Sequence, residues 1–226
     1  MGPVTTIAPR PDAVVERLQL DETSWVDIAR GWLDGADELF EILRRDVAWR
    51  ENKNWRYDHA VTENRLHAGV RFDGRTPLPH ESLVAVHRGV RKVAGVPFAD
   101  GFTMMLYRDG NDGQGFHRDD DMKWTEDTRI AILTLGAQRP WYLRPRSHRN
   151  QHGLENKGAT HDLRPAGGDL LVMGGRCQAD WEHCVPVQRT PVGPRISLQW
   201  RWTSRTGRQE RTAGFGAPLS YSRRGR

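Results

Sequence analysis

Short apolar runs divide the second half of the chain. They cover residues 103–107, 130–136, 169–175 and 195–202, and glycine, proline or charged residues stand between them. Runs of this length with such boundaries are typical of buried β-strands, because a helix needs a longer stretch with apolar residues every three or four positions. The pattern therefore predicts a mainly β domain.

The run at residues 195–202 alternates strictly between polar and apolar side chains. The polar members are Arg195, Ser197, Gln199 and Arg201, and the apolar members are Ile196, Leu198, Trp200 and Trp202. Strand side chains point alternately to opposite faces, so the two sets lie on different sides of the sheet. The polar set is either a solvated edge or the inner wall of a small barrel, where arginine would bind a carboxylate bidentately.

Two segments in the first half of the chain have the spacing of amphipathic helices. Residues 34–46 place apolar side chains every three or four positions, and so do residues 83–93, which Gly95 and Pro97 follow. Glycine just past a helical pattern is a common helix end. We expect both helices to pack on the outside of the sheet, residues 14–20 to form a first strand, and the proline-rich residues 1–13 to be flexible.

Composition and charge limit the class of protein. The chain has 226 residues, a mass of 25.8 kDa and a mean hydropathy of −0.73, which fits one soluble domain, and no run is long enough to span a bilayer. Two cysteines are too few for a disulfide scaffold and fit the reducing cytoplasm, and Cys184 is expected to pack in the core. We expect a monomer that does not act at membranes.

The net charge of +5 permits a polyanionic partner without requiring one. Much of the excess lies in the arginine-rich residues 203–226, which glycine and serine interrupt. This composition predicts a disordered tail. The tail either contacts phosphates or only raises solubility.

Three residues are candidates for a metal site. His117 and Asp119 are two positions apart, so an extended segment points both side chains to the same side. His183, beyond the third apolar run, supplies a second imidazole. Two histidines and one carboxylate on one face of an iron are the ligand set of non-haem Fe(II) oxygenases, and they leave positions open for a co-substrate and oxygen. His-x-Asp alone is also common in acidic surface turns.

Taken together, these residues resemble the AlkB-type Fe(II)/2-oxoglutarate dioxygenases over about residues 49–202. The resemblance rests on His117-Arg118-Asp119, on His183, and on Arg195 and Arg201 with five residues between them, and residues 106–110, 135–139 and 178–183 add to it. It implies a double-stranded β-helix, or jelly roll, with N-terminal helices in one domain at residues 14–202. It also implies that the metal residues are catalytic and that Tyr107, Arg195, Ser197 and Arg201 bind 2-oxoglutarate.

For this family the resemblance implies oxidative demethylation. The enzyme would use Fe(II), 2-oxoglutarate and O2 to remove methyl groups from N-alkylated bases in DNA or RNA during alkylation repair, releasing formaldehyde, succinate and CO2. A lid at about residues 54–78 would bind the base. The substrate candidates are Arg56, Tyr57, His67 and Asp121.

The chain also departs from the family pattern. Gly69 and Val70 stand where many members have an aromatic pair, so His67 or Phe72 would have to form the base-stacking wall. Met105 stands at a position that is often asparagine, which removes a hydrogen bond to 2-oxoglutarate worth about 1 kcal/mol. Two alternatives therefore stay open: a related dioxygenase that hydroxylates a small molecule or protein, and a non-catalytic nucleic-acid binder.

Overall fold

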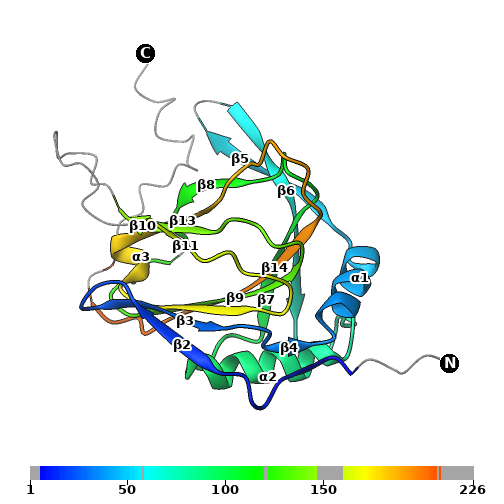
Figure 1. Cartoon of the computed structure of the whole chain (residues 1–226), viewed down its shortest axis with the longest axis horizontal. Helices are drawn as coiled ribbons and strands as arrows, with labels where there is room; N and C mark the ends of the chain where they lie inside the picture. Colours follow the sequence, from blue (N-terminus) through cyan, green and yellow to red (C-terminus); the bar gives the residue numbers. More distant parts are fainter. Residues whose placement is uncertain (1–5, 57–58, 120–121, 147–159, 208, 210–226) are drawn as a thin grey trace.

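Eight antiparallel strands form the main sheet of the computed structural model (Figure 1). The structure describes residues 6–56, 59–119, 122–146, 160–207 and 209, and for residues 53–62 only the backbone. In spatial order the strands are β2 (Val15–Gln19), β3 (Ser24–Ala29), β12 (Leu170–Gly175), β9 (Thr128–Gly136), β14 (Arg195–Thr203), β7 (Gly101–Tyr107), β6 (His59–Arg71) and β5 (Arg50–Arg56). Each apolar run predicted as a strand is a central strand of this sheet.

A smaller antiparallel sheet faces the main one. In spatial order it consists of β11 (His161–Asp162), β10 (Tyr142–Pro145), β13 (Trp181–Val185) and β8 (Gln114–His117). Apolar side chains meet between the two sheets, among them Ile132 and Leu171 from the main sheet, Leu143 from the small sheet and Trp141, which directly precedes β10. The short helix α3 (Cys177–Asp180) connects β12 to β13. Two facing antiparallel sheets are the arrangement that the predicted jelly roll requires.

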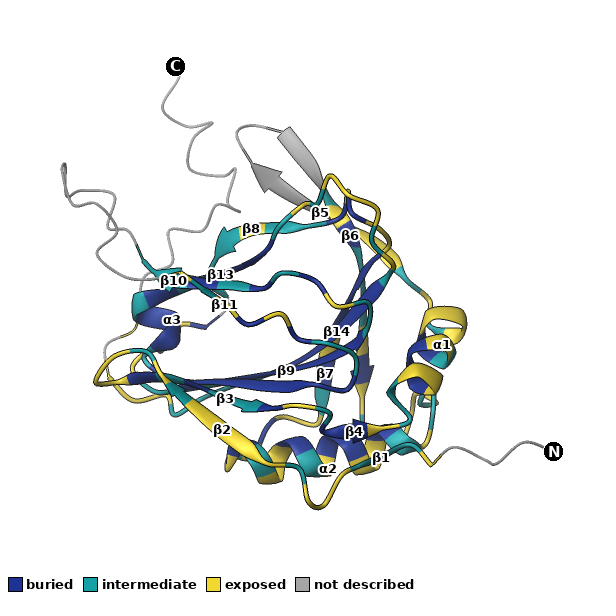
Figure 2. Cartoon of the chain, in the orientation of Figure 1, coloured by how far each residue is buried: buried dark blue, intermediate teal, exposed yellow. Residues whose placement is uncertain are grey.

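Two helices cover the outer face of the main sheet. Helix α1 (Ala36–Asp46) buries Leu39 and Leu43, and α2 (Ser82–Ala94) buries Leu83, Val86 and Val90 in the same core. Figure 2 shows the central strands buried and the outward sides of both helices exposed. The predicted helices are confirmed, and α2 ends as expected at Gly95, whose φ of 68° is left-handed.

Strand β14 separates this outer core from the space between the sheets. Its outward residues Ile196, Leu198 and Trp200 are buried against the helices. The inward residues Arg195 and Ser197 are also buried, because β14 lies between β9 and β7 and has no free edge. The polar side chains of this strand are therefore not a solvated edge. The interpretation that they form an inner wall is confirmed.

Several boundaries differ from the sequence-based expectations. Ala8–Pro9 forms β1 and pairs with β4 (Leu33–Asp34), so the prediction of a flexible N-terminus is wrong for these two residues. The segment proposed as a lid overlaps a hairpin of the main sheet, β5 and β6. Thr203, assigned to the tail, belongs to β14. Residues 1–5 and 210–226 lie outside the described residues.

Two further expectations concern cysteines and membranes. Cys177 and Cys184 are both buried and form no disulfide with each other, and for Cys184 burial agrees with the expected packing. Within the described ranges no helix is long and apolar enough to cross a bilayer.

Gly175 and Gly95 allow a matched test of the fold. Both have left-handed φ angles, 66° and 68°, so alanine is strained at either position. A Cβ at Gly175 would also collide with the Thr23 carbonyl and the Trp25 ring, whereas at Gly95 it would meet nothing within 4 Å. We expect Gly95→Ala to cost about 1 kcal/mol of unfolding free energy and Gly175→Ala to cost about 1–3 kcal/mol more. Urea denaturation midpoints would measure both, and equal midpoints would contradict the packing at Gly175.

Candidate active site

The three metal candidates converge between the two sheets. His117 ends β8 and pairs directly with His183 on the neighbouring strand β13, and Asp119 follows β8 after one residue. One ligand atom from each lies within 4.8 Å of the other two, and the imidazole centroids are 4.3 Å apart. Strand pairing brings the two histidines together. Asp119 joins them because it follows His117 by two residues. The predicted constellation is thus brought together.

The ring nitrogens of the two histidines are suited to binding a cation. His117 Nδ1 lies 2.9 Å from the carbonyl oxygen of Gly115, and when it donates there, the lone pair is on Nε2, which lies 3.8 Å from Asp119 Oδ1. Burial lowers the pKa of His183 to about 3, so its imidazole is neutral at pH 7, the form that binds metals. Two imidazoles beside a carboxylate fit Fe(II).

Asp119 is held as an anion. Its side chain is only 6% exposed, and burial alone would raise its pKa. The positive charge and the hydrogen bond of Arg201 are the main causes that outweigh burial and lower that pKa to about 2. Arg201 Nε donates to Asp119 Oδ2 at 2.5 Å, and its predicted contact with 2-oxoglutarate stays a prediction. The carboxylate is thus fixed in orientation and charge.

Two residues that the sequence did not single out support the ligands. The backbone N–H of Asp119 donates to Gln178 Oε1 at 2.9 Å, and the Trp141 ring stacks on His183 at 5.4 Å between centroids. Gln178 lies within the stretch that carries the AlkB resemblance, so its position was available as a signal. Trp141 had none, because its contact exists only once β10 and β13 pair.

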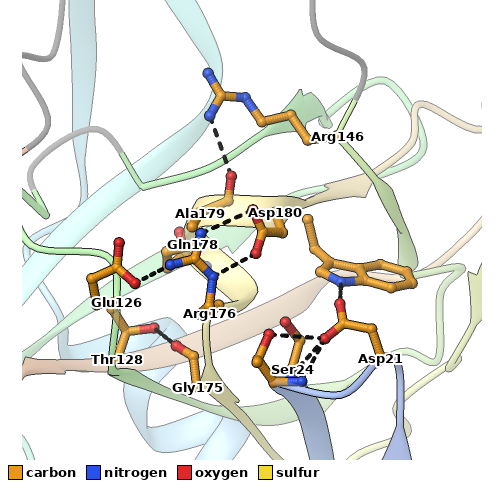
Figure 3. Close-up of polar contacts among 12 residues, drawn as sticks. Asp21, Ser24, Glu126, Thr128, Arg146, Gly175, Arg176, Gln178, Ala179 and Asp180 are labelled. Carbon is orange, nitrogen blue, oxygen red and sulfur yellow. Dashed lines mark hydrogen bonds and ion pairs between the residues drawn. The ribbon is translucent and has the colours of Figure 1, made fainter. Parts of the chain in front are cut away.

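Polar contacts fasten α3, which carries Gln178 (Figure 3). Arg176 binds Asp180 with 2.8 Å between Nε and Oδ2, and it also pairs with Glu126. The indole N–H of Trp181, the first residue of β13, donates to Asp21 at 2.6 Å. The contacts of Arg176 and Trp181 therefore hold the segment that carries Gln178 and His183.

Arg195 forms an anion site deeper between the sheets. Its guanidinium is fully buried, and its only hydrogen bond to a described residue runs from Nη2 to Thr134 Oγ1 at 3.1 Å. Burial lowers its pKa to about 10, so the group remains charged at pH 7. Nε and Nη1 have no acceptor among the described residues. A buried cation with two open donors fits a carboxylate such as that of 2-oxoglutarate.

Tyr107 and Ser197 line the same inner face. Tyr107 pairs across the strands with Arg195, and Ser197 pairs with Met105. The Tyr107 hydroxyl accepts a hydrogen bond from Arg65 at 3.2 Å, so its own proton is available to another acceptor. Arg65, which the sequence analysis did not name, thereby orients the tyrosine. The individual roles assigned to Tyr107, Ser197 and Met105 stay predictions.

The substrate candidates do not all fall in the described part of the chain. The Arg56 side chain, Tyr57 and Asp121 lie outside it. His67 lies opposite Met105, on the inner face of β6, and its Nε2 is 2.5 Å from Glu63. Phe72 contacts His87 and Phe102 in the outer core, so the suggestion that it forms the base-stacking wall is wrong.

The fold and the site together define a class. Two facing antiparallel sheets enclose a His-Asp-His cluster, with a buried open arginine further along the same space. This is the arrangement of an Fe(II)-dependent oxygenase that uses an anionic co-substrate.

Comparison with known proteins gives the family. Residues 70–208 match the profile of the 2OG-Fe(II) oxygenase superfamily, and the chain belongs to that superfamily. It is 29% identical over 192 residues to alpha-ketoglutarate-dependent dioxygenase alkB homolog 3 of Bos taurus, covering 79% of this chain and 66% of the relative. It is 30% identical over 184 residues to DNA oxidative demethylase ALKBH2 of Mus musculus, covering 74% of each. The chain thus spans about two thirds to three quarters of these relatives.

Solved structures support the fold. OsALKBH1 matches with a TM-score of 0.51 at 15% identity, covering 84% of this chain and 100% of the other. A prolyl hydroxylase from Trichoplax adhaerens matches with a TM-score of 0.53 at 13% identity, covering 77% and 82%. The predicted jelly roll, the AlkB-like family and its cofactors Fe(II), 2-oxoglutarate and O2 are confirmed.

The metal site predicts a selective loss of affinity. Anaerobic calorimetry with Fe(II) should show one site in the wild-type chain, and His117→Ala should weaken it by at least about 100-fold, since loss of a supporting partner alone costs 10–100-fold. His161→Ala is the matched control, because His161 lies on the small sheet outside the cluster. Equal affinities in the two variants would contradict this assignment.

The Arg195 site predicts a co-substrate effect. Arg195→Lys keeps a positive charge but loses the planar fork, so the dissociation constant of 2-oxoglutarate should rise by about ten- to a hundredfold. Arg129→Lys, on the same sheet but paired with Asp127, should leave it unchanged. Calorimetry on the metal-loaded proteins measures both, and an unchanged constant in Arg195→Lys would place the co-substrate elsewhere.

Proposed function

We propose that this protein oxidatively demethylates N-alkylated bases in nucleic acid, with DNA as the first substrate. The single observation that carries the proposal is the intact His117-Asp119-His183 cluster in a chain similar to relatives named DNA oxidative demethylase. Alkylation repair is the process that such an activity would serve. A non-catalytic binder would have no need of this cluster or of the open Arg195.

The chain's residues would divide the reaction between them. Bound Fe(II) with 2-oxoglutarate and O2 supplies the oxidation of a methyl C–H bond, after which the hydroxymethyl group leaves nitrogen as formaldehyde, with succinate and CO2 as the other products. His117, Asp119 and His183 would hold the metal, and Arg195 would orient the carboxylate of the co-substrate. Arg201 keeps Asp119 ionised and in place.

The exposed side of the metal cluster indicates where a base would enter. The His117 side chain is 26% exposed, whereas Asp119 and His183 are buried. His117 belongs to β8, the edge strand of the small sheet, and the loop before β8 is bonded to β6 through Gly113 N–H and the Asn64 carbonyl at 3.0 Å. The substrate would therefore approach between β8 and the β5–β6 hairpin, where His67 and Glu63 lie.

A second feature supports an aromatic, anionic substrate. A pocket of about 790 Å³ lies beside Arg201, and Trp124, Lys123 and Arg205 are among the residues that line it. Aromatic rings that stack on bases and cations that contact phosphates are the side chains that bind single strands. The net charge of +5 acts in the same direction.

Other properties complete the proposal. A cytoplasmic location fits the two buried free thiols, which a reducing compartment preserves. A monomer that acts on nucleic acid and not at membranes agrees with the sequence. The prolyl hydroxylases among the structural neighbours share only the fold at 13–15% identity, so they do not favour a protein substrate.

The decisive assay measures three quantities together. Protein reconstituted with Fe(II) and 2-oxoglutarate, then exposed to air, is given a single-stranded oligonucleotide with 1-methyladenine or 3-methylcytosine, as DNA and as RNA. We expect succinate, formaldehyde and lost methyl groups in equal amounts, and a rate at least about 1,000-fold lower in His117→Ala, because the reaction depends on the metal. His161→Ala should retain wild-type turnover.

Each other outcome has a distinct meaning. Succinate without formaldehyde would show an active oxygenase whose substrate is a small molecule or protein, which contradicts the demethylase proposal. Absence of succinate with every substrate would contradict oxygenase activity itself.

A further inference from the structure

A second pocket lies on the far side of the main sheet from the metal cluster. It has a volume of about 460 Å³, within the range of small-molecule sites, and we call it the α2 pocket. It is lined by Arg71, Phe72, Gly74, Thr76, Leu78, Val84, His87, Arg88 and Arg91. Phe72 packs against the outer core, whereas the iron ligands lie between the sheets. The two sites are therefore separate.

One face of α2 forms a wall of this pocket. Val84, Arg88 and Arg91 follow each other at spacings of four and three residues, so their side chains project from the same side of the helix. Val84 is 44% exposed, so its side chain adds apolar surface to this face of the helix. Phe72 and Leu78 supply the facing apolar surface. The wall is thus apolar near the sheet and cationic at its rim.

His87 offers an unused donor at the base of the pocket. The Trp200 indole N–H donates to His87 Nδ1 at 3.0 Å, so Nδ1 is the acceptor and the proton of the neutral ring is on Nε2. Burial favours this neutral ring by lowering the pKa of His87. The residue is 8% exposed, and Nε2 has no partner among the described residues. A buried N–H without an acceptor is rare in native proteins and indicates a missing ligand or water.

The rim carries a concentrated positive charge. Arg71, Arg88 and Arg91 are exposed, and their guanidinium groups form no hydrogen bond or ion pair with any residue that the structure describes. The nearby Asp73 accepts N–H bonds from Arg75 and Thr76 in its own loop. Three guanidinium groups at one opening match a dianion such as a phosphate monoester better than a single carboxylate.

We propose that the α2 pocket binds a nucleoside monophosphate. The base would lie against Phe72 and Leu78 and accept the hydrogen bond of His87 Nε2, and the phosphate would contact Arg88 and Arg91. A planar ring suits this wall because the Phe72 and His87 rings already contact each other there, with centroids 4.5 Å apart and planes tilted by 35°. A bare anion would leave the apolar wall and His87 unused. This binding does not depend on the iron site or on the proposed demethylation.

The nucleotide has two possible sources with the same chemistry. It is either a free mononucleotide or the phosphorylated end of a strand. Calorimetry with adenosine 5′-monophosphate and with a 5′-phosphorylated single-stranded oligonucleotide, using the full chain, distinguishes them. If the mononucleotide binds, the ligand of the pocket is a free nucleotide. If only the oligonucleotide binds, the ligand is the phosphorylated end of a strand. Either result supports the proposal.

Matched variants locate the binding. We expect Arg88→Ala/Arg91→Ala to weaken it by at least about tenfold, because two charge-assisted contacts are lost. Lys92→Ala removes a neighbouring exposed charge of α2 that does not line the pocket, and it should change affinity less than about twofold. Val84→Glu places a carboxylate in the pocket and should abolish binding while the arginines remain. All these positions are exposed, so thermal unfolding should stay near that of the wild type.

Two readouts separate this site from the iron site. Binding should persist in His117→Ala, and the ¹⁵N resonance of His87 Nε2 should shift when the mononucleotide is added. Failure to bind either nucleotide at about 5 mM would overturn the proposal. So would equal losses in Lys92→Ala and the double arginine variant, or inorganic phosphate binding as tightly as the mononucleotide. Loss of binding in His117→Ala would assign the nucleotide to the iron site instead.

Discussion

The ion pair between Arg201 and Asp119 is the interaction on which the active site depends. Asp119 follows the edge strand of the small sheet, and Arg201 lies on the central strand β14 of the main sheet, so their 2.5 Å contact joins the two sheets at the metal. A buried carboxylate is costly unless it is paired and hydrogen-bonded. Arg201 and the backbone contact with Gln178 supply both, and they keep the negative charge where Fe(II) requires it.

The register of β14 couples this chemistry to the core. Its outward side chains pack under the helices, while Arg195, Ser197 and Arg201 face the small sheet. A slip of one residue would exchange the two faces, burying arginines in the apolar core and tryptophans in the site. Pairing with β9 along the whole strand and with β7 along most of it prevents that slip. The stability of the outer core therefore fixes the co-substrate residues as well.

The sequence predicted those parts whose signal is local. Apolar runs gave the central strands, helical spacing and Gly95 gave α2, and the His-x-Asp spacing with a later histidine gave the metal candidates. The two-residue strand at Ala8–Pro9 has no pattern of its own, because its pairing depends on β4 and the helix beside it. The β5–β6 hairpin is mostly polar, as suits the edge of a sheet, and so resembles a loop. Trp141 gains its role from packing on His183, which only the assembled small sheet creates.

Arg195 and His87 are buried residues with donors unpaired in the described part of the chain, a property that neither the sequence pattern nor helix and strand propensities reveal. Each is buried, and each keeps donors without acceptors among the described residues, on opposite faces of the same sheet. In sequence both occupy ordinary alternating or helical positions. Folding alone would favour apolar residues there, because an unpaired buried donor opposes stability. Local violations of this kind are expected where a site awaits a ligand. For Arg195 we expect that ligand to be the co-substrate of the family, and the same reasoning applied to His87 leads to the second ligand that we propose.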